Sequence, residues 1–332
     1  MRLSIVVPAF NSEGTLASCL ASIRKSSFQE YEIIVVDDGS TDSTKLIAAR
    51  FTDQLIAHKT NRGRSAARNK GAKSAKEEVI VFLDSDVMVK SDTLSIIVRY
   101  FVEQPEVDAV SGLLAKQHPN RNFFSQYKNL YMHYIFTQLP EQIDFLYGSI
   151  HALRREALLP YGTDVSVADD TALGQRLVKN GKKIAFIPDL EVIHLKSYSL
   201  CSFVFNDFRI PFDWAIIFIR NKGWRQLGKG GTGFAHAPVN QLTSLVIAPM
   251  NLVLGAGCLY TVQLVVPTIL LLTTWYVLNH RFTLFLKRER GVNFGLLSIP
   301  VTFVDHLVMD CGIITGVFAS IFLRDKVKKV KD

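Results

Sequence analysis

Two aspartates stand two positions apart just after an apolar run of the chain. The run Glu78 to Leu83 is expected to form a buried strand, and Asp84 and Asp86 follow it directly. Carboxylates at this spacing can hold Mg²⁺ or Mn²⁺ against phosphate oxygens. A cation held there neutralises charge on a phosphate leaving group. An Asp-x-Asp pair is common in loops, so the motifs around it decide its meaning.

A second acidic strand end lies earlier in the chain. Asp37 and Asp38 follow the apolar run Glu32 to Val36. Such carboxylates can accept hydrogen bonds from a nucleobase N–H and from a ribose hydroxyl. An Asx turn with a helix cap explains Asp42, but it does not require two further aspartates before it.

The first apolar run ends at Pro8, and Phe10 stands on the loop beyond it. An aromatic ring in this place can stack on a nucleobase, because every base has a flat face. The alternative is an ordinary strand-to-helix turn in which Asn11 or Ser12 caps the helix.

Small and basic residues alternate in the segment Asn61 to Gly71. Gly63 and its small neighbours permit close approach of a ligand, and cations such as Arg68 suit a diphosphate. The alternative is the basic surface of a helix.

These motifs need a scaffold that brings strand ends together. Short continuous apolar runs alternate with helical patterns through the first half of the chain. That alternation predicts an α/β fold with a mostly parallel sheet and helices on both faces. Ligands in such sheets bind at the carboxyl ends of the strands, which is where both acidic pairs stand.

One more acidic pair, Asp169 and Asp170, opens a helix expected to run to about Asn180, with Gly181 as its stop. A carboxylate there can serve as a general base for an acceptor hydroxyl. The alternative is acidic capping of a helix N-terminus, which is favourable by itself.

Taken in order, PAFN, VDDGSTD, NRGRSAARN, FLDSD and the acidic pair resemble family 2 glycosyltransferases, which are inverting enzymes with the GT-A fold. The resemblance covers about the first 200 residues. It implies metal-assisted transfer of a sugar from a nucleotide-sugar donor, with Mg²⁺ or Mn²⁺ as cofactor. The donor-binding residues that it implies are Pro8, Phe10, Glu13, Asp37, Asp38, Gly63, Arg68 and Asp84.

The resemblance also assigns the remaining roles. Asp86 is the principal metal ligand with Asp84 beside it, and Asp170 is the catalytic base. The family usually has Glu before this Asp, and Asp169 replaces it here, so either carboxylate can be the base. A late metal ligand at His194 is possible, although a core or surface histidine is the simpler interpretation. Three residues are expected on the acceptor side: Gly148, Ser149 and Arg176.

The second half of the chain differs in composition. The net charge of the chain is +8, and much of the excess lies beside long apolar runs rather than in a nucleic-acid motif. This placement favours a membrane surface as partner and excludes nucleic acid. The four cysteines are far apart, which indicates neither a disulfide framework nor a zinc site.

Three regions are therefore expected. Residues 1–200 form the GT-A domain, 201–239 amphipathic interfacial helices and a linker, and 240–332 a transmembrane helical domain with a basic tail. No signal peptide is apparent at the N-terminus, so the catalytic domain is expected in the cytosol of a multi-pass protein. The basic segments at 281–290 and after 323 both favour the cytosolic side, and three crossings would separate them.

The function expected is inverting transfer from a UDP- or GDP-sugar to a membrane-associated acceptor: a polyprenyl-linked sugar, a polyprenyl phosphate or a glycolipid. A dolichol- or polyprenyl-phosphate sugar transferase is the nearest alternative. The Gln-x-x-Arg-Trp motif of processive synthases is absent. A nucleotidyltransferase would carry a Gly-rich basic loop after the first strand, where this chain has Ala9 to Glu13. A non-catalytic membrane scaffold is a further alternative.

Overall fold

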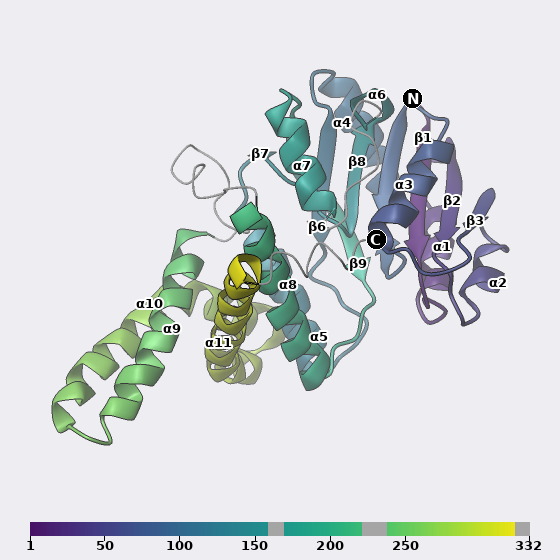
Figure 1. The fold of residues 1–332 in the computed structure, drawn as a ribbon. Coiled ribbons are helices and arrows are strands. Elements are labelled where there is room, and N and C mark those ends of the chain that lie inside the picture. The colour runs from purple at the N-terminus through teal and green to yellow at the C-terminus, as the bar shows by residue number, and fades with distance from the viewer. Residues whose placement is uncertain (159–168, 221–237, 323–332) are drawn as a thin grey trace. The chain divides into compact units, whose positions relative to one another are not determined.

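The computed structural model describes residues 1–158, 169–220 and 238–322. The chain divides into two compact units. One, the sheet unit, comprises Met1–Arg121 and Leu139–Ser197; the other, the helical unit, comprises Asn122–Gln138 and Tyr198–Asp332. Figure 1 shows the strands gathered in the first and only helices in the described part of the second.

The sheet unit is built on one mixed sheet with the strand order β3-β2-β1-β4-β8-β6-β9-β5, and β7 pairs with β9. Strands β3, β2, β1 and β4 run parallel to one another, and β6 runs parallel to β9. Strand β8 lies antiparallel between β4 and β6. The strands are β1 (Leu3–Ala9), β2 (Tyr31–Asp37), β3 (Gln54–Ala57), β4 (Val79–Leu83), β5 (Val87–Val89), β6 (Ala109–Leu114), β7 (Gln142–Ile143), β8 (Ile150–Arg154) and β9 (Ile184–His194).

The central strands are apolar because both of their faces are covered. Every residue of β1 and of β4 is buried, as expected for strands between two helical layers. Helix α3 shows how close this packing is, because a Cβ on Gly71 would stand 2.3 Å from Cγ1 of Val6. The helices of this unit are α1 (Leu16–Arg24), α2 (Thr44–Ala48), α3 (Arg64–Ser74), α4 (Thr93–Glu103), α6 (Arg155–Leu158) and α7 (Asp169–Lys179). The predicted α/β fold of the GT-A type is confirmed.

The parallel register brings the chemical motifs to one edge of the sheet. Ala9 at the end of β1 pairs with Asp37 at the end of β2, and Val6 pairs with Phe82 near the end of β4. The loops after these strands therefore leave the sheet on the same side. This is the edge at which ligands bind in sheets of this kind.

In its described residues, the helical unit contains five long helices packed around aromatic side chains. The aromatic stretch at 123–136 forms α5, which packs here although its sequence lies between strands of the sheet unit. The last apolar run of the chain forms a single helix, α11. The elements are α5 (Phe123–Phe136), α8 (Leu200–Arg220), α9 (Val239–Gly257), the 3₁₀ turn η4 (Val262–Leu264), α10 (Val265–Arg290) and α11 (Val292–Phe322).

Three helices of this unit are long and apolar enough to cross a membrane: α9, η4 with α10, and α11. They expose many large apolar side chains, unlike helices of a water-soluble bundle. Buried positions of α11 include Ser298 and Thr302, whereas Leu297 and Phe318 are exposed. A hydrocarbon solvent accounts for apolar side chains that point outward and polar ones that point inward.

Candidate functional site

A pocket of about 610 Å³ lies at the carboxyl edge of the sheet. Its size is within the usual range for small-molecule sites. It draws on the β1–α1 loop, the end of β2, the start of α3, the β4–β5 loop and the segment after β9. The lining residues are Pro8, Ala9, Phe10, Asn11, Ser12, Gly14, Thr15, Asp38, Asn61, Arg64, Ala67, Asp84, Ser85, Asp86, Leu195, Lys196 and Ser197.

The β1–α1 loop presents an aromatic ring to this pocket. Phe10 lines the pocket and is 45% exposed. The next residue, Asn11, has a φ of 47°, a left-handed conformation that few non-glycine residues adopt. The Asn11 side chain accepts a hydrogen bond from Thr41 N–H (2.9 Å), and Asn11 N–H donates to Ser40 Oγ (3.0 Å). These bonds hold the loop so that Phe10 faces open space.

Asp38 is buried and organises the loop before α3. Its carboxylate accepts hydrogen bonds from Arg62 N–H (2.9 Å) and Gly63 N–H (2.7 Å), and it lies 2.6 Å from Nδ1 of His58. A carboxylate has about four acceptor positions, so roughly one remains for a ligand. Gly63 has a φ of 89° at the start of α3, where the chain reverses.

Glu13 and Asp37 do not line the pocket; they accept hydrogen bonds from the neighbouring turn. Glu13 Oε2 accepts from Ser43 N–H (3.1 Å), and Asp37 Oδ1 accepts from Ser40 N–H (3.2 Å). Both carboxylates therefore hold the β2–α2 loop on which Asp38 stands.

Arg68 joins the end of β4 to the start of α7. Its Nη2 donates to Asp84 Oδ1 and to Gly148 O, each at 2.8 Å, while its Nη1 lies 3.6 Å from Asp170 Oδ2. Arg64 Nη1 lies 3.7 Å from the other oxygen of Asp84. Burial raises the pKa of Asp84, and the two arginines oppose this rise.

The backbone at Gly148 leaves room for this arrangement. A Cβ there would stand 2.4 Å from Asp170 Oδ2 and 3.3 Å from Arg68 Nη2, so a side chain would displace Asp170. The next residue, Ser149, is buried, and its carbonyl accepts a long hydrogen bond of 3.4 Å from Asp84 N–H. The predicted acceptor-side pair therefore packs directly behind Asp84 and Asp170.

Asp86 is the more open of the two carboxylates after β4, with 31% of its side chain exposed against 17% for Asp84. Its Oδ2 lies 3.6 Å from Nε2 of His194 at the end of β9. Burial alone would raise the pKa of Asp86. The hydrogen-bonding and charge of His194, with the charge of Lys196, outweigh burial and hold this pKa below its usual value.

The Asp86–His194 pair fits a divalent cation. Two ligands of one cation lie about 3 to 4 Å apart, and the oxygen and nitrogen of this pair are 3.6 Å apart. Among the described residues, no group of three or more His, Cys, Asp and Glu side chains would hold an ion by itself. Mg²⁺ is commonly held by one or two carboxylates together with substrate phosphates, so donor oxygens would complete the shell.

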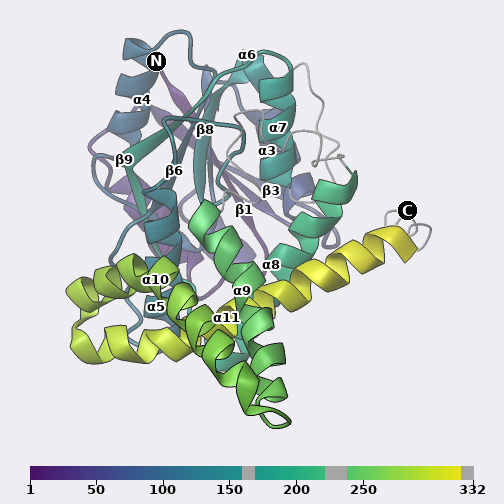
Figure 2. The ribbon, with the colours of Figure 1, turned by 90° about the vertical axis from the view of Figure 1, so that its left-hand side faces the viewer.

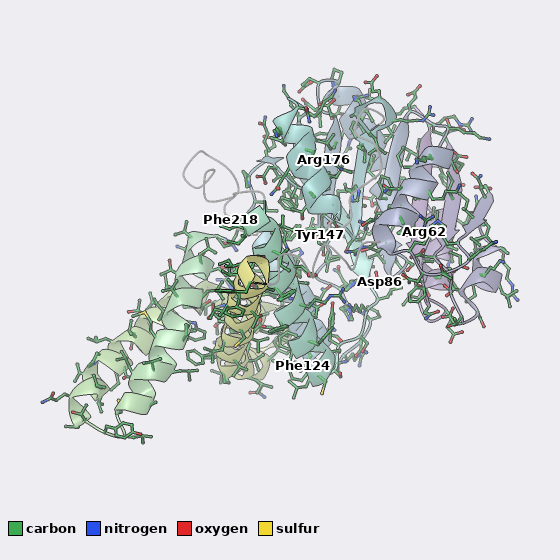
Figure 3. All side chains as sticks on the ribbon, viewed as in Figure 1. Arg62, Asp86, Phe124, Tyr147, Arg176 and Phe218 are labelled. Carbon is green, nitrogen blue, oxygen red and sulfur yellow. The ribbon has the colours of Figure 1, made fainter. Side chains whose placement is uncertain are left out.

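Most of the predicted site residues thus fall into two sets. Pro8, Phe10, Asp38, Asp84 and Asp86 line the pocket. A second set supports these residues from behind the lining, and it consists of Glu13, Asp37, Gly63, Arg68, Gly148, Ser149 and Asp170. Arg176 lies further along α7, well apart from Asp86 in Figure 3. The side chain of Asp169 lies outside the part of the chain that the structure describes.

The pocket-lining residues that sequence reasoning did not assign include Arg64, Lys196 and Ser197. Arg64 belongs to the basic segment that was singled out, four residues before Arg68. The other two follow β9, more than 100 residues beyond the β4 motif. No local pattern connects that segment to the pocket, because only the β5–β9 pairing brings His194 opposite Val87.

A mixed α/β sheet with acidic strand ends over one pocket defines a GT-A-type fold with a nucleotide-sized cleft. Residues 4–162 match the family Glycosyl transferase family 2. The chain therefore carries a family 2 glycosyltransferase domain, as the motifs predicted.

Curated relatives resemble parts of this domain. Glycosyltransferase GlyG of Streptococcus pneumoniae is 37% identical over 115 residues, which are 33% of this chain and 38% of the relative. A UDP-Glc:α-D-GlcNAc-diphosphoundecaprenol β-1,3-glucosyltransferase of Escherichia coli is 37% identical over 87 residues, 25% of this chain and 34% of the relative. The matched stretches span well under half of either relative.

Among solved structures, a mannosyltransferase from Pyrobaculum calidifontis in complex with GDP-Man and Mn²⁺ has a similar fold. The TM-score is 0.59 at 19% identity, and the match covers 98% of this chain and 88% of that one. At this level of identity, the likeness concerns the fold of the chain alone.

Proposed function

We propose that this protein transfers a sugar from a UDP- or GDP-sugar to a membrane-associated acceptor, with inversion at the anomeric carbon. One observation carries the proposal. The aromatic ring of Phe10 and the carboxylates of Asp38 and Asp86 face a single pocket, and Arg68 links Asp84 in that pocket to Asp170 behind it.

In this proposal the donor lies along the carboxyl edge of the sheet. Phe10 stacks on the base, and Asp38 accepts from the base with the acceptor position that its internal bonds leave open. Arg64 and Lys196 line the pocket and balance diphosphate charge. Asp84 is left to contact the ribose.

Asp86 and His194 would hold Mg²⁺ or Mn²⁺, with Asp84 next to them. When bound, such a cation neutralises charge that develops on the nucleotide diphosphate as it leaves. Asp84 has both oxygens close to arginines, so Asp86 is the better-placed ligand of the two.

Asp170 is the proposed general base. Its Oδ1 accepts from the N–H of Thr171, and Arg68 lies 3.6 Å from Oδ2. These contacts fix the carboxylate in a defined rotamer. Asp170 takes the proton of the acceptor hydroxyl while that oxygen attacks the sugar from the face opposite the diphosphate. A single displacement of this kind inverts the configuration.

The acceptor is proposed to be lipid-linked: a polyprenyl-linked sugar, a polyprenyl phosphate or a glycolipid. Helices α9, α10 and α11 are suited to a bilayer, and a membrane site gives ready access to lipid-borne substrates. One relative acts on a diphosphoundecaprenol-linked sugar, according to its name. The basic segments beside the apolar helices favour a cytosolic location for the sheet unit.

A thermal-shift panel with UDP, GDP and their common sugars, each with Mn²⁺ or Mg²⁺, tests the donor site. A ligand at 100 times its dissociation constant stabilises the native state by about 2.7 kcal/mol, so a rise in Tm is expected for one nucleotide class. Phe10→Ala should reduce that rise. The exposed Val102→Ala, on α4 and outside the pocket lining, is the matched control. Absence of a shift with every nucleotide would refute the donor site.

A further inference from the structure

The helical unit contains two kinds of apolar helix. Helices α9 and α10 pack against each other as a hairpin, joined by a short turn around Tyr260. Helix α11 runs across this hairpin rather than alongside it, as both views show (Figure 1, Figure 2). If the hairpin is perpendicular to a bilayer, α11 lies closer to the plane of that bilayer.

The hairpin has the dimensions of a membrane-crossing pair. The segment from Val239 to His280 contains no Lys, Arg, Asp or Glu. Helix α9 has 19 residues, about 28 Å at 1.5 Å per residue, close to the roughly 30 Å hydrocarbon core. Tyr260 at the turn is 90% exposed. At the end of the hairpin away from this turn, the last turn of α10 carries Lys287 and Arg288.

The first half of helix α11 is bound to a helix that cannot enter the bilayer core. The Tyr127 hydroxyl on α5 donates to Thr302 Oγ1 on α11 at 2.9 Å. At the end of α10, two residues before α11 begins, Arg290 Nε donates to Gln126 Oε1 on α5 at 2.7 Å. The sequence of α5 is joined at both ends to the sheet unit, which ends at Arg121 and resumes at Leu139. A helix of 14 residues with both ends so tethered stays at the surface of a membrane.

The second half of α11 is bound to α8. Gly312 and Gly316 of α11 lie against the backbone of α8, and Cβ atoms there would be 2.2 Å from Phe208 O and 2.5 Å from Phe212 O. On the same stretch of α8, Arg209 pairs with Asp213, and 67% of the Arg209 side chain is exposed. An exposed charge of this kind is costly in hydrocarbon, so α8 and the part of α11 that packs on it belong at the interface.

We propose that the chain crosses the membrane twice, through the α9–α10 hairpin, and that α5, α8 and α11 lie along the membrane face from which this hairpin enters. The proposal rests on the membrane location given under the proposed function. The surface that contacts lipid is the apolar side of α11, whose exposed residues include Leu296, Leu297, Val304, Ile314 and Phe318.

Two crossings also agree with the distribution of basic residues along the chain. They place the basic residues at the end of α10 and those beyond 323 on one face, where anionic lipid attracts them. Three crossings would carry the basic tail to the opposite face, against the tendency of Lys and Arg to remain in the cytosol.

Cysteine labelling of the full chain in intact cells tests the proposal. Two variants share a Cys201→Ser/Cys258→Ser/Cys311→Ser background and add either Tyr260→Cys at the hairpin turn or Lys331→Cys in the tail. Cys19 remains; it is buried, and burial raises its pKa, so its thiol stays protonated and unreactive. The background alone measures residual labelling at Cys19. A membrane-impermeant maleimide is applied before and after permeabilisation.

The turn variant should be labelled in intact cells, and the tail variant only after permeabilisation. Labelling of the tail in intact cells would mean that α11 crosses, and a turn that is labelled only after permeabilisation would mean that the hairpin does not cross. Either result overturns the proposal. Release of the chain by alkaline carbonate would instead refute its membrane location. A failure of sugar transfer alone would leave the labelling pattern unchanged, so the two failures are distinguishable.

Discussion

Replacing Asp170 by Asn removes the proposed general base with little change in shape. Asn retains an oxygen that can accept from Thr171 N–H, and Arg68 keeps its 2.8 Å bonds to Asp84 and Gly148. The interaction lost within the protein is the 3.6 Å contact between Arg68 and Asp170. We therefore expect the variant to fold.

The expected loss of kcat follows from the role of Asp170 as general base. General-base catalysis contributes about 10²- to 10⁴-fold, so kcat should fall by that factor, or about 2.7 to 5.4 kcal/mol in the barrier at 1.36 kcal/mol per tenfold. Donor affinity should change less than threefold, because Asp170 does not line the pocket. An acceptor that is already ionised, such as a lipid phosphate, would show a much smaller loss.

The assay uses the nucleotide sugar chosen by the thermal-shift panel, labelled in the sugar, with membranes as the source of acceptor. Lipid-extractable label reports transfer, and titration calorimetry of the nucleotide reports donor binding. Asp189→Asn is the matched control, since Asp189 is exposed on β9 and outside the pocket lining. A tenfold loss of donor affinity would assign Asp170 to the donor site. Unchanged transfer to a hydroxyl acceptor would remove it from catalysis.

Three further predictions use the same assays. Excess EDTA, or Asp86→Ala, should abolish transfer and the metal-dependent part of the nucleotide shift; activity that survives both would exclude metal assistance. Gly148→Ala should lower kcat by about 100-fold with donor affinity intact, because the new methyl displaces Asp170 Oδ2; an unchanged kcat would show that this placement is unimportant. Asp207→Asn should lower the stability of the detergent-solubilised protein by about 3 to 5 kcal/mol, because Lys128 then loses its buried partner, and a Lys128→Met/Asp207→Leu pair should recover most of the loss. An unchanged Tm in the single variant would contradict that account.

Much of the fold was predictable because its signals are local. Continuous apolar runs such as Ser4 to Val7 identify strands buried on both faces, and the alternation with helices indicates a parallel arrangement. The antiparallel insertion of β8 between β4 and β6 was not predictable. Its short apolar run looks like any other strand, and pairing partners depend on contacts between residues distant in the chain.

In the helical unit, too, the sequence indicated the helices but not all of their packing partners. The absence of Lys, Arg, Asp and Glu from Leu242 to Leu278 indicated a pair of apolar helices by itself. The aromatic stretch of α5 gave no sign that it packs with those helices, although it lies between two strands in sequence. Its place is set by packing of Tyr127 and Tyr131 against Phe282 and by the bond from Tyr127 to Thr302.

For the site, the sequence by itself determined which carboxylates meet. Strands that run parallel end at one edge, so Asp38 and Asp86 had to share it once their strands were recognised. Only the tertiary structure decided how they are held. Arg68 reaches Asp84, Gly148 and Asp170 at once, and His194 arrives beside Asp86 through the pairing of β9 with β5. These contacts join residues tens to more than 100 positions apart, and no spacing in the sequence encodes them, because they follow from the path of the chain through the sheet.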